Sequence, residues 1–330
     1  MRQFIVIITF FLFFSSTVSA ETNAKPSRED LLSERMSYYI QYGTEHFIPW
    51  YYLAAMDQFE RNIQLVREDI PKREGSIALQ FHEDFWAGPL NPNKNDTSTA
   101  TIDMFGGKGQ DGNNDGKADR NDVEDVLYTM GRYLSEYGQS EEDFKLALWD
   151  YYKREESVRQ ILTISKIYQS NGTLDLYDHA FPLPLNQNYS YRSTWGDNRG
   201  WGGRRIHEGT DLFASYGVPV LATTHGVIEV MGWNEYGGWR IGLRDIHNVY
   251  HYFAHLGSFS KDLKKGDIVK PGTIIGYVGS SGYGKKGTSG KFPPHLHYGM
   301  YLDNGRTEWA FDPYPSLAIW ERQQKTNRES

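Results

Sequence analysis

Residues 295–301 read His-Leu-His-Tyr-Gly-Met-Tyr, an apolar and aromatic run of strand length that begins with two histidines. Side chains two positions apart on a strand point to the same face of a sheet. We therefore expect the imidazoles of His295 and His297 to project together, so that one can bind a metal while the other meets a substrate. Taken alone, such a pair is equally compatible with two ordinary surface histidines.

Short runs of the same kind surround this one from Phe181 onward, and turn pairs such as Gly237-Gly238 and Asn304-Gly305 separate them. Further strands are predicted at 218–222, 227–231, 268–269 and 274–278. We expect an antiparallel β domain over residues 173–320, followed by a polar tail, residues 321–330, that frays.

A second histidine motif, His207-Glu208-Gly209-Thr210-Asp211, precedes these strands. A helical zinc site is excluded, because an aspartate stands at the second ligand position and Gly209 weakens a helix. On an extended chain, His207 and Asp211 share one face and can converge on one ion. Imidazole and carboxylate ligands suit zinc and leave a fourth position for water. The motif by itself also fits a site without metal.

The alternating run from Val249 to Leu256 predicts a third histidine-bearing strand. Alternation would place His251, Phe253 and His255 on one face and Tyr250, Tyr252 and Ala254 on the other. On this pattern alone, His251 and His255 are ordinary half-buried members of a sheet.

In this order, the motifs resemble the M23 (lysostaphin- or LytM-type) family of zinc metallopeptidases over residues 181–312. The resemblance also rests on Phe253-Ala254-His255-Leu256, on Lys265-Gly266-Asp267-Ile268-Val269 with Gly272-Thr273-Ile274-Ile275-Gly276, and on Pro294-His295-Leu296-His297. It implies that His207, Asp211 and His297 bind zinc, that His255 and His295 are catalytic, and that peptidoglycan is the substrate.

Within that implied site, we assign His295 as the base, since it stands beside His297, and His255 to stabilising the charge of the tetrahedral intermediate. His251, His225 and His247 match no functional position of the family. Residues 280–294 form a longer segment than the family pattern leads us to expect. We predict that this segment rims the cleft and influences which bond is accepted.

Residues 21–172 are expected to form a separate helical domain. Val123, Leu127, Met130, Leu134 and Tyr137 lay one apolar stripe on a helix. Ser140 with Asp143 predicts a helix start, residues 144–168 a long amphipathic stretch, and Asn171-Gly172 a stop.

An acidic loop in this domain has the layout of an EF-hand-like calcium site. Its candidate ligands are Asp111, Asn113, Asp115, Lys117, Asp119 and Asp122. Asp122 replaces the usual bidentate Glu and could instead cap the following helix. The alternative is a solvated turn without calcium.

This loop, with residues 123–127 and 131–134, resembles a segment of lysozyme-like lytic transglycosylases. Residues 53–60 look like the helix that carries their catalytic glutamate, which would be Glu60. A carboxyl group within an apolar stripe can have its pKa raised and act as a general acid. The alternative is that Glu60 is an ordinary surface acid and the domain only supports or binds the wall.

The first twenty residues predict a signal peptide, with Arg2 before an apolar run and a small-residue cleavage site at Val18-Ser19-Ala20. We expect a secreted or cell-wall protein, attached to a membrane only if this signal is retained. Cysteine is absent, so any metal must be bound by His, Asp or Glu. The net charge of −7 argues against nucleic acid, and the 15% aromatic content suggests a cleft for an extended polymer.

The leading functional hypothesis is therefore an exported zinc endopeptidase that cuts stem peptides or cross-bridges of peptidoglycan. The two-part layout looks most like the sporulation-linked LytH-type endopeptidases, which implies an L-Ala-D-Glu cut. Two alternatives stay open: a non-catalytic M23-type wall-binding regulator, and a bifunctional enzyme that also cleaves glycan through Glu60.

Overall fold

The structure is a computed structural model that describes residues 26–200 and 205–329. The predicted signal peptide, residues 1–20, lies outside the described residues. Among the helices of those ranges, none has both the length and the apolar character needed to span a bilayer.

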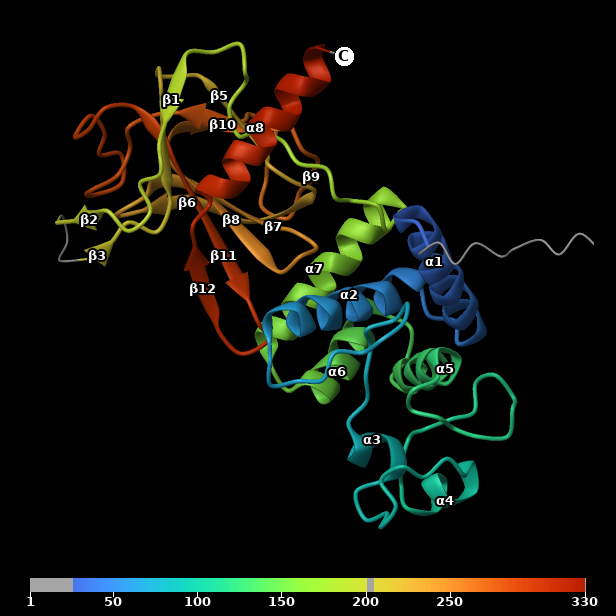
Figure 1. Cartoon of the computed structure of the whole chain (residues 1–330). Coiled ribbons are helices and arrows are strands. Elements are labelled where there is room, and N and C mark those ends of the chain that lie inside the picture. Colours follow the sequence, from blue (N-terminus) through green and yellow to red (C-terminus); the bar gives the residue numbers. More distant parts are fainter. Residues whose placement is uncertain (1–25, 201–204, 330) are drawn as a thin grey trace, which may run out of the picture.

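The amino-terminal half is helical, as expected, and its helices gather on one side of the β-sheet (Figure 1). The helices are α1 (Arg28–Glu45), α2 (Trp50–Val66), α3 (Glu83–Ala87), α4 (Thr99–Met104), α5 (Val123–Ser135), α6 (Glu141–Tyr152) and α7 (Glu155–Asn171). Helix α2 packs against α1 and α7. It is the central helix, since Leu53, Ala55 and Met56 have no exposed surface.

The ends of these helices follow local capping chemistry. Ser140 and Asp143 form a capping box at the start of α6, and Asp122 accepts the backbone N–H groups of Glu124 and Asp125 at the start of α5. Gly172 ends α7 in the left-handed conformation (φ 67°). These predicted boundaries are confirmed. The expected continuous stretch over 144–168 is wrong, because Lys153 adopts a left-handed conformation (φ 49°) that separates α6 from α7.

A buried carboxylate joins α1, α2 and the segment that follows α2. Asp57 has no exposed surface. Its partners are Arg35 Nη2 (3.2 Å), Arg61 Nη2 (3.0 Å), the Tyr39 hydroxyl (2.7 Å), and the backbone N–H groups of Ala78 and Leu79. Burial alone would raise the pKa of Asp57, but Arg61, Arg35 and these hydrogen bonds lower it below its ordinary value.

Replacing Asp57 by Asn should therefore destabilise the protein by about 3–5 kcal/mol at pH 7, because Arg35 would be left buried without a counter-charge. The folded-state pKa is lowered, so the stabilisation is present above the ordinary value of 3.8 and is lost as the pH falls through the folded pKa. Urea unfolding of both proteins at pH 7 and below pH 4 measures this. Asp69→Asn, which removes an exposed partner of Arg67, is the control and should change little.

The carboxyl-terminal half is a mainly antiparallel β-sheet, as predicted. Its order is β1 (Tyr189–Tyr191), β4 (Thr210–Ala214), β11 (His295–Asp303), β8 (Val249–Phe259), β7 (Gly238–Arg244), β6 (Gly226–Asn234) and β9 (Ile268–Val269). Strand β12 (Glu308–Phe311) pairs with β11, and β10 (Ile274–Val278) pairs with β8 and β5 (Pro219–Leu221); β2 (Asn198–Arg199) and β3 (Arg205–Ile206) pair separately. Leu296, Phe253 and Tyr298 lie fully buried in its core.

The chain does not end in the frayed tail predicted for residues 321–330. Helix α8 (Tyr314–Glu329) covers this region and crosses the sheet domain in Figure 1. Leu317 and Trp320 are buried in the core of the sheet domain, and Glu321 accepts hydrogen bonds from the hydroxyls of Tyr189 and Tyr191. These contacts anchor a segment whose composition alone suggested none.

Helix α7 contacts the sheet through buried ion pairs. Arg154 binds Asp303, at the end of β11, with an Nη2–Oδ2 distance of 2.6 Å, and Asp303 has no exposed surface. Arg244 of β7 is only 2% exposed and pairs with Glu308 (2.7 Å), Glu229 (3.3 Å) and Glu156 of α7 (3.7 Å). Glu229 also pairs with Arg159 of α7. The helical half is thus joined by ion pairs to strands β6, β7 and β11.

Candidate metal centre

Three neighbouring strands bring the histidine motifs together. Strand β11 lies between β4 and β8, and in this register His297 stands directly opposite Asp211 on β4 and Ala254 on β8. His207 lies just before β4, and His255 follows Ala254. Segments about 40 to 90 residues apart in the chain therefore converge because antiparallel pairing sets their residues side by side.

The ligand atoms of His207, Asp211 and His297 form one compact group. His207 Nε2 lies 2.8 Å from His297 Nδ1 and 3.1 Å from Asp211 Oδ1, and His297 Nδ1 lies 3.0 Å from the same oxygen. The three residues could hold a metal ion, and within the described ranges they are the one such group of at least three His, Cys, Asp or Glu side chains. Two imidazoles and a carboxylate converging on one point suit zinc.

Electrostatics within the group favour a charged Asp211. Burial by itself would raise the pKa of this carboxyl group, yet its contacts with the imidazoles of His207 and His297 and the closeness of His295 hold its pKa far below the ordinary range. Burial lowers the pKa of His297, which keeps that imidazole neutral and able to act as a ligand.

Thr194 orients two members of the group, a role that no motif indicated. Its carbonyl oxygen lies 2.7 Å from His207 Nδ1, so the Nδ1–H of His207 donates to it and leaves Nε2 as the ligand atom. Its Oγ1 accepts the backbone N–H of Asp211 at 3.1 Å. Gly209 is equally constrained, because a Cβ there would lie 2.5 Å from the His297 ring.

His295 and His255 flank the ligand group. His295 Nε2 lies 3.7 Å from Asp211 Oδ1, while its Nδ1 lies 2.8 Å from the carbonyl oxygen of Pro293. The His255 Nδ1 lies 2.7 Å from the carbonyl oxygen of Ser281. The two rings have centroids 4.9 Å apart. In both residues the Nδ1–H is satisfied by a backbone carbonyl, so Nε2 of the neutral ring is left as a hydrogen-bond acceptor.

The predicted alternation along β8 is wrong at His255. His251 is buried on the core side, where it contacts Tyr298 (2.6 Å) and Asp245 (3.1 Å), in keeping with a structural role. His255 does not follow it: this residue lines the cleft together with Tyr252. The backbone of His255 is left-handed (φ 62°), and the register of β8 against β7 shifts at this place. Such a bulge turns a side chain to the other face of the sheet.

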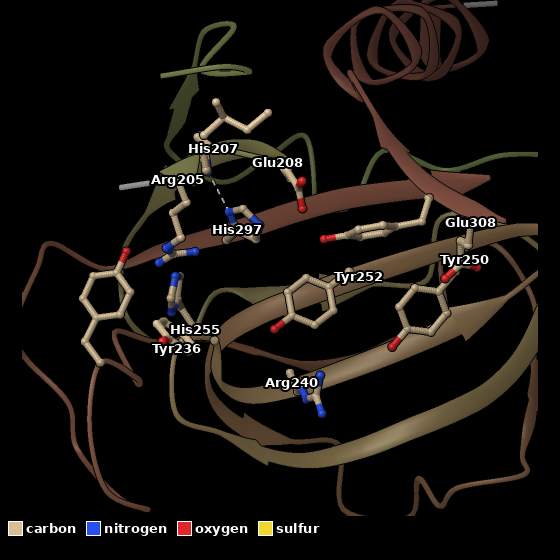
Figure 2. A pocket seen from close by; sticks show the side chains of 14 residues that line it. Arg205, His207, Glu208, Tyr236, Arg240, Tyr250, Tyr252, His255, His297 and Glu308 are labelled. Atoms are coloured by element: carbon tan, nitrogen blue, oxygen red, sulfur yellow. Dashed lines mark hydrogen bonds between the residues drawn. The ribbon is translucent and has the colours of Figure 1, made fainter. Parts of the chain in front are cut away.

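A cleft of about 420 Å³ extends from the metal group along the sheet (Figure 2). Five tyrosines line it: Tyr236, Tyr250, Tyr252, Tyr283 and Tyr301. Glycines make room for two of them, since a Cβ at Gly237 would lie 2.1 Å from the Tyr252 hydroxyl, and one at Gly242 would lie 1.9 Å from the Tyr250 hydroxyl. An aromatic cleft of this kind fits an extended polymer.

The long segment 280–294 borders this cleft, as predicted. Tyr283 lines it, Ser281 contributes the carbonyl that contacts His255, and a bridge between Ser281 and Ser289 folds the segment back on itself. Its influence on bond selection stays a prediction.

The acidic loop of the helical half receives no support as a calcium site. Its acids are not among the metal-binding groups of the described residues. Asp111 accepts the backbone N–H groups of Asp115 and Gly116, Asn113 and Asp115 accept others within the loop, and Asp122 caps α5. These carboxylates are engaged in turn and cap hydrogen bonds, and calcium stays a prediction.

Glu60 lies far from this centre in the chain, at a cavity of about 700 Å³ in the helical half. Burial raises the pKa of Glu60 to about 7, against the opposing influence of Tyr152. The expectation of a raised pKa is therefore met in the structure, whereas a catalytic role stays a prediction.

A buried His-Asp-His group at the end of an aromatic cleft, with two further imidazoles beside it, is the arrangement of a metal-dependent hydrolase. Comparisons with known proteins agree. Residues 205–313 match the model of peptidase family M23. The L-Ala–D-Glu endopeptidase of Bacillus subtilis is 53% identical over 317 residues, which cover 96% of this chain and 97% of that protein. The chain belongs to peptidase family M23.

Other similarities cover a smaller share of the chain. A glycyl-glycine endopeptidase of Staphylococcus capitis is 39% identical over 113 residues, which cover 34% of this chain and 29% of that protein. The catalytic domain of lysostaphin from Staphylococcus simulans, a solved structure, shares 32% identity with a TM-score of 0.34 and covers 43% of this chain and 99% of that one. The lysozyme-like character of the helical half is not shown by these similarities and stays a prediction.

Proposed function

We propose that this protein is a zinc endopeptidase that hydrolyses the L-Ala–D-Glu bond of peptidoglycan stem peptides. The observation that carries the proposal is the near full-length similarity to an enzyme of that name. The converging ligand atoms of His207, Asp211 and His297 support it. The same similarity supports the proposal of an exported enzyme that acts in the cell wall, and a role in sporulation is part of this proposal.

In this proposal His207 Nε2, Asp211 Oδ1 and His297 Nδ1 hold the zinc ion. When bound, zinc polarises the scissile carbonyl and makes a water molecule acidic enough to ionise near neutral pH. His295 accepts the proton of that water on Nε2, the ring nitrogen that faces Asp211. We assign His255 to the negative charge that develops on the substrate. Because the Nδ1–H of His255 donates to Ser281 and burial lowers the pKa of this ring, Nε2 would take up a proton only as that negative charge develops beside it.

Digestion of purified peptidoglycan tests this function. Analysis of the released termini should give new D-Glu amino termini and an equal amount of new L-Ala carboxyl termini. New glycine or diamino-acid termini instead would place the cut elsewhere. A protein that binds the wall but releases no new amino terminus would be a regulator, which contradicts the proposal.

A second candidate activity is favoured by one observation. Burial raises the pKa of Glu60 to about 7 beside a cavity, so a large fraction of this carboxyl group carries a proton near neutral pH, as a general acid for glycan cleavage would require. Digestion with a His297→Ala variant isolates this activity, since any reducing or anhydro-sugar ends then cannot depend on the peptidase. If the His297→Ala variant releases such sugar ends and the His297→Ala, Glu60→Gln double variant does not, the enzyme is bifunctional. If the His297→Ala variant releases none, glycan cleavage by this protein is excluded.

Glu60→Gln also has a predicted effect on stability. The folded-state pKa of about 7 is above the ordinary 4.5, so the native state is most favoured below pH 4.5 and loses stability as the pH rises to about 7. A shift of about 2.5 units corresponds to roughly 3 kcal/mol. The variant should thus be more stable than the wild type by up to about 3 kcal/mol at pH 8 and equal to it near pH 4. Denaturant unfolding at the two pH values measures this difference, and an unchanged stability at pH 8 would contradict it.

A further inference from the structure

One cationic group in the cleft has no counter-charge in the protein. Arg240 of β7 is partly buried and lines the cleft. Its Nε is buried without a hydrogen-bond partner, and no acidic side chain of the described ranges forms an ion pair with it. Arginine stays charged at every physiological pH, and a buried donor without an acceptor is unfavourable. Arg240 interacts with Tyr252, yet the free protein presents a guanidinium without an acidic partner to whatever enters the cleft.

The neighbouring acids do not neutralise it. Glu308, at the far end of the cleft, is bound by the buried Arg244 at 2.7 Å. Figure 2 shows Glu208 beside His297, with the ring of Tyr252 between these residues and Arg240. The cleft thus has a negative group on the metal side of Tyr252 and an unpaired positive group on the opposite side.

Arg240 lines the same cleft as His297 of the metal group. Its Cζ lies 5.9 Å from the centroid of the Tyr252 ring, and that ring lies 5.9 Å from the ring of His297. One aromatic ring therefore separates the guanidinium from a residue of the metal group. An extended peptide advances about 3.3–3.6 Å per residue, so a peptide bound at the metal group reaches Arg240 within its next few residues.

We propose that Arg240 is the specificity residue that binds the free carboxylate of the D-Glu following the scissile bond. This inference rests on the proposed function. A glutamate has two carboxyl groups, and because only one continues the peptide chain, the other is free to pair with a guanidinium. The planar fork of arginine matches a carboxylate with two parallel hydrogen bonds. A glycine-only substrate offers no such group, so Arg240 selects an acidic stem peptide over an uncharged cross-bridge.

The test compares two stem peptides that differ only in this group. One contains L-Ala-D-Glu with its free carboxylate, and the other carries the same glutamate as the primary amide. We measure kcat/KM for both with the zinc-loaded, full-length wild type and with Arg240→Gln. The wild type should prefer the acid, and Arg240→Gln should lose about 10- to 100-fold on the acid while the amide is cleaved almost as before, which abolishes the preference.

Two variants complete the test. Arg240→Lys keeps the charge without the fork and should restore part of the preference, which a merely structural role of Arg240 would not produce. Arg205→Gln removes the other guanidinium of the cleft. Should Arg205→Gln abolish the preference, or should Arg240→Gln slow both peptides equally, the assignment to Arg240 is wrong although the proposed function stands. A wild type that cleaves neither peptide overturns the proposed function and this inference with it.

Discussion

Replacing His297 by alanine is expected to abolish zinc binding and to lower kcat/KM on peptidoglycan by at least about 10³-fold. His297 Nδ1 lies within 3.0 Å of both other ligand atoms, so its loss leaves only His207 and Asp211 facing each other. Catalytic zinc sites normally have three protein ligands, and two do not hold the ion at ordinary concentrations. Activity should fall because the nucleophile is no longer generated.

Metal analysis of the purified protein, with activity on the same sample, measures both effects. The wild type should carry one zinc per chain, lose activity with a chelator and regain it when zinc is added back. His247→Gln is the matched control, because His247 packs against Tyr177 away from the cleft and should keep metal and activity. A His297→Ala protein that retains stoichiometric zinc would show that the ion is bound elsewhere.

Part of this centre could be predicted because Asp211, His295 and His297 lie on regular strands. Alternation on a strand sends His295 and His297 to one face, and the structure places both beside Asp211. The motif from His207 to Asp211 also brings its two ligands together, but His207 lies before β4, beyond a bend at Gly209, so strand alternation does not explain this pair. Gly209 allows the ring of His297 to approach. Local sequence is informative here because the geometry depends on neighbours a few residues apart.

The parts that could not be predicted depend on contacts between distant segments. The bulge that turns His255 into the cleft follows from the register between β7 and β8, which no local pattern encodes. Thr194 acts through its position beside His207 and Asp211. The chain beyond residue 320 is polar, yet α8 is anchored by Leu317 and Trp320, near its beginning. Composition describes a segment and does not reveal what packs against it.

The ion pairs between α7 and the sheet show why the two halves act as one unit at the cleft. Glu308 lines the far end of the cleft, and its partner Arg244 is held in turn by Glu229 and by Glu156 of α7. None of the described residues of the helical half lines the cleft, so the helical half can act on it only through these ion pairs. We propose that the helical half supports the peptidase cleft.

The second large effect concerns the two histidines that flank the metal group. His295→Ala and His255→Ala should each lower kcat by about 10²- to 10⁴-fold while zinc stays bound, because neither ring belongs to the ligand group. Zinc content and kcat measured on the same preparations check this. A His295→Ala protein that loses its zinc would mean that His295 is a ligand.

Glutamine at the same two positions separates the roles. A glutamine side chain donates hydrogen bonds but is not a base at neutral pH. At position 255, where we assign stabilisation of negative charge, glutamine should recover about 10-fold over alanine, because its amide N–H can still contact the developing oxyanion. At position 295 it should recover nothing, since the proton of the attacking water would have no acceptor. Recovery at 295 but not at 255 would reverse the assignment, making His255 the base and His295 the group that stabilises the intermediate.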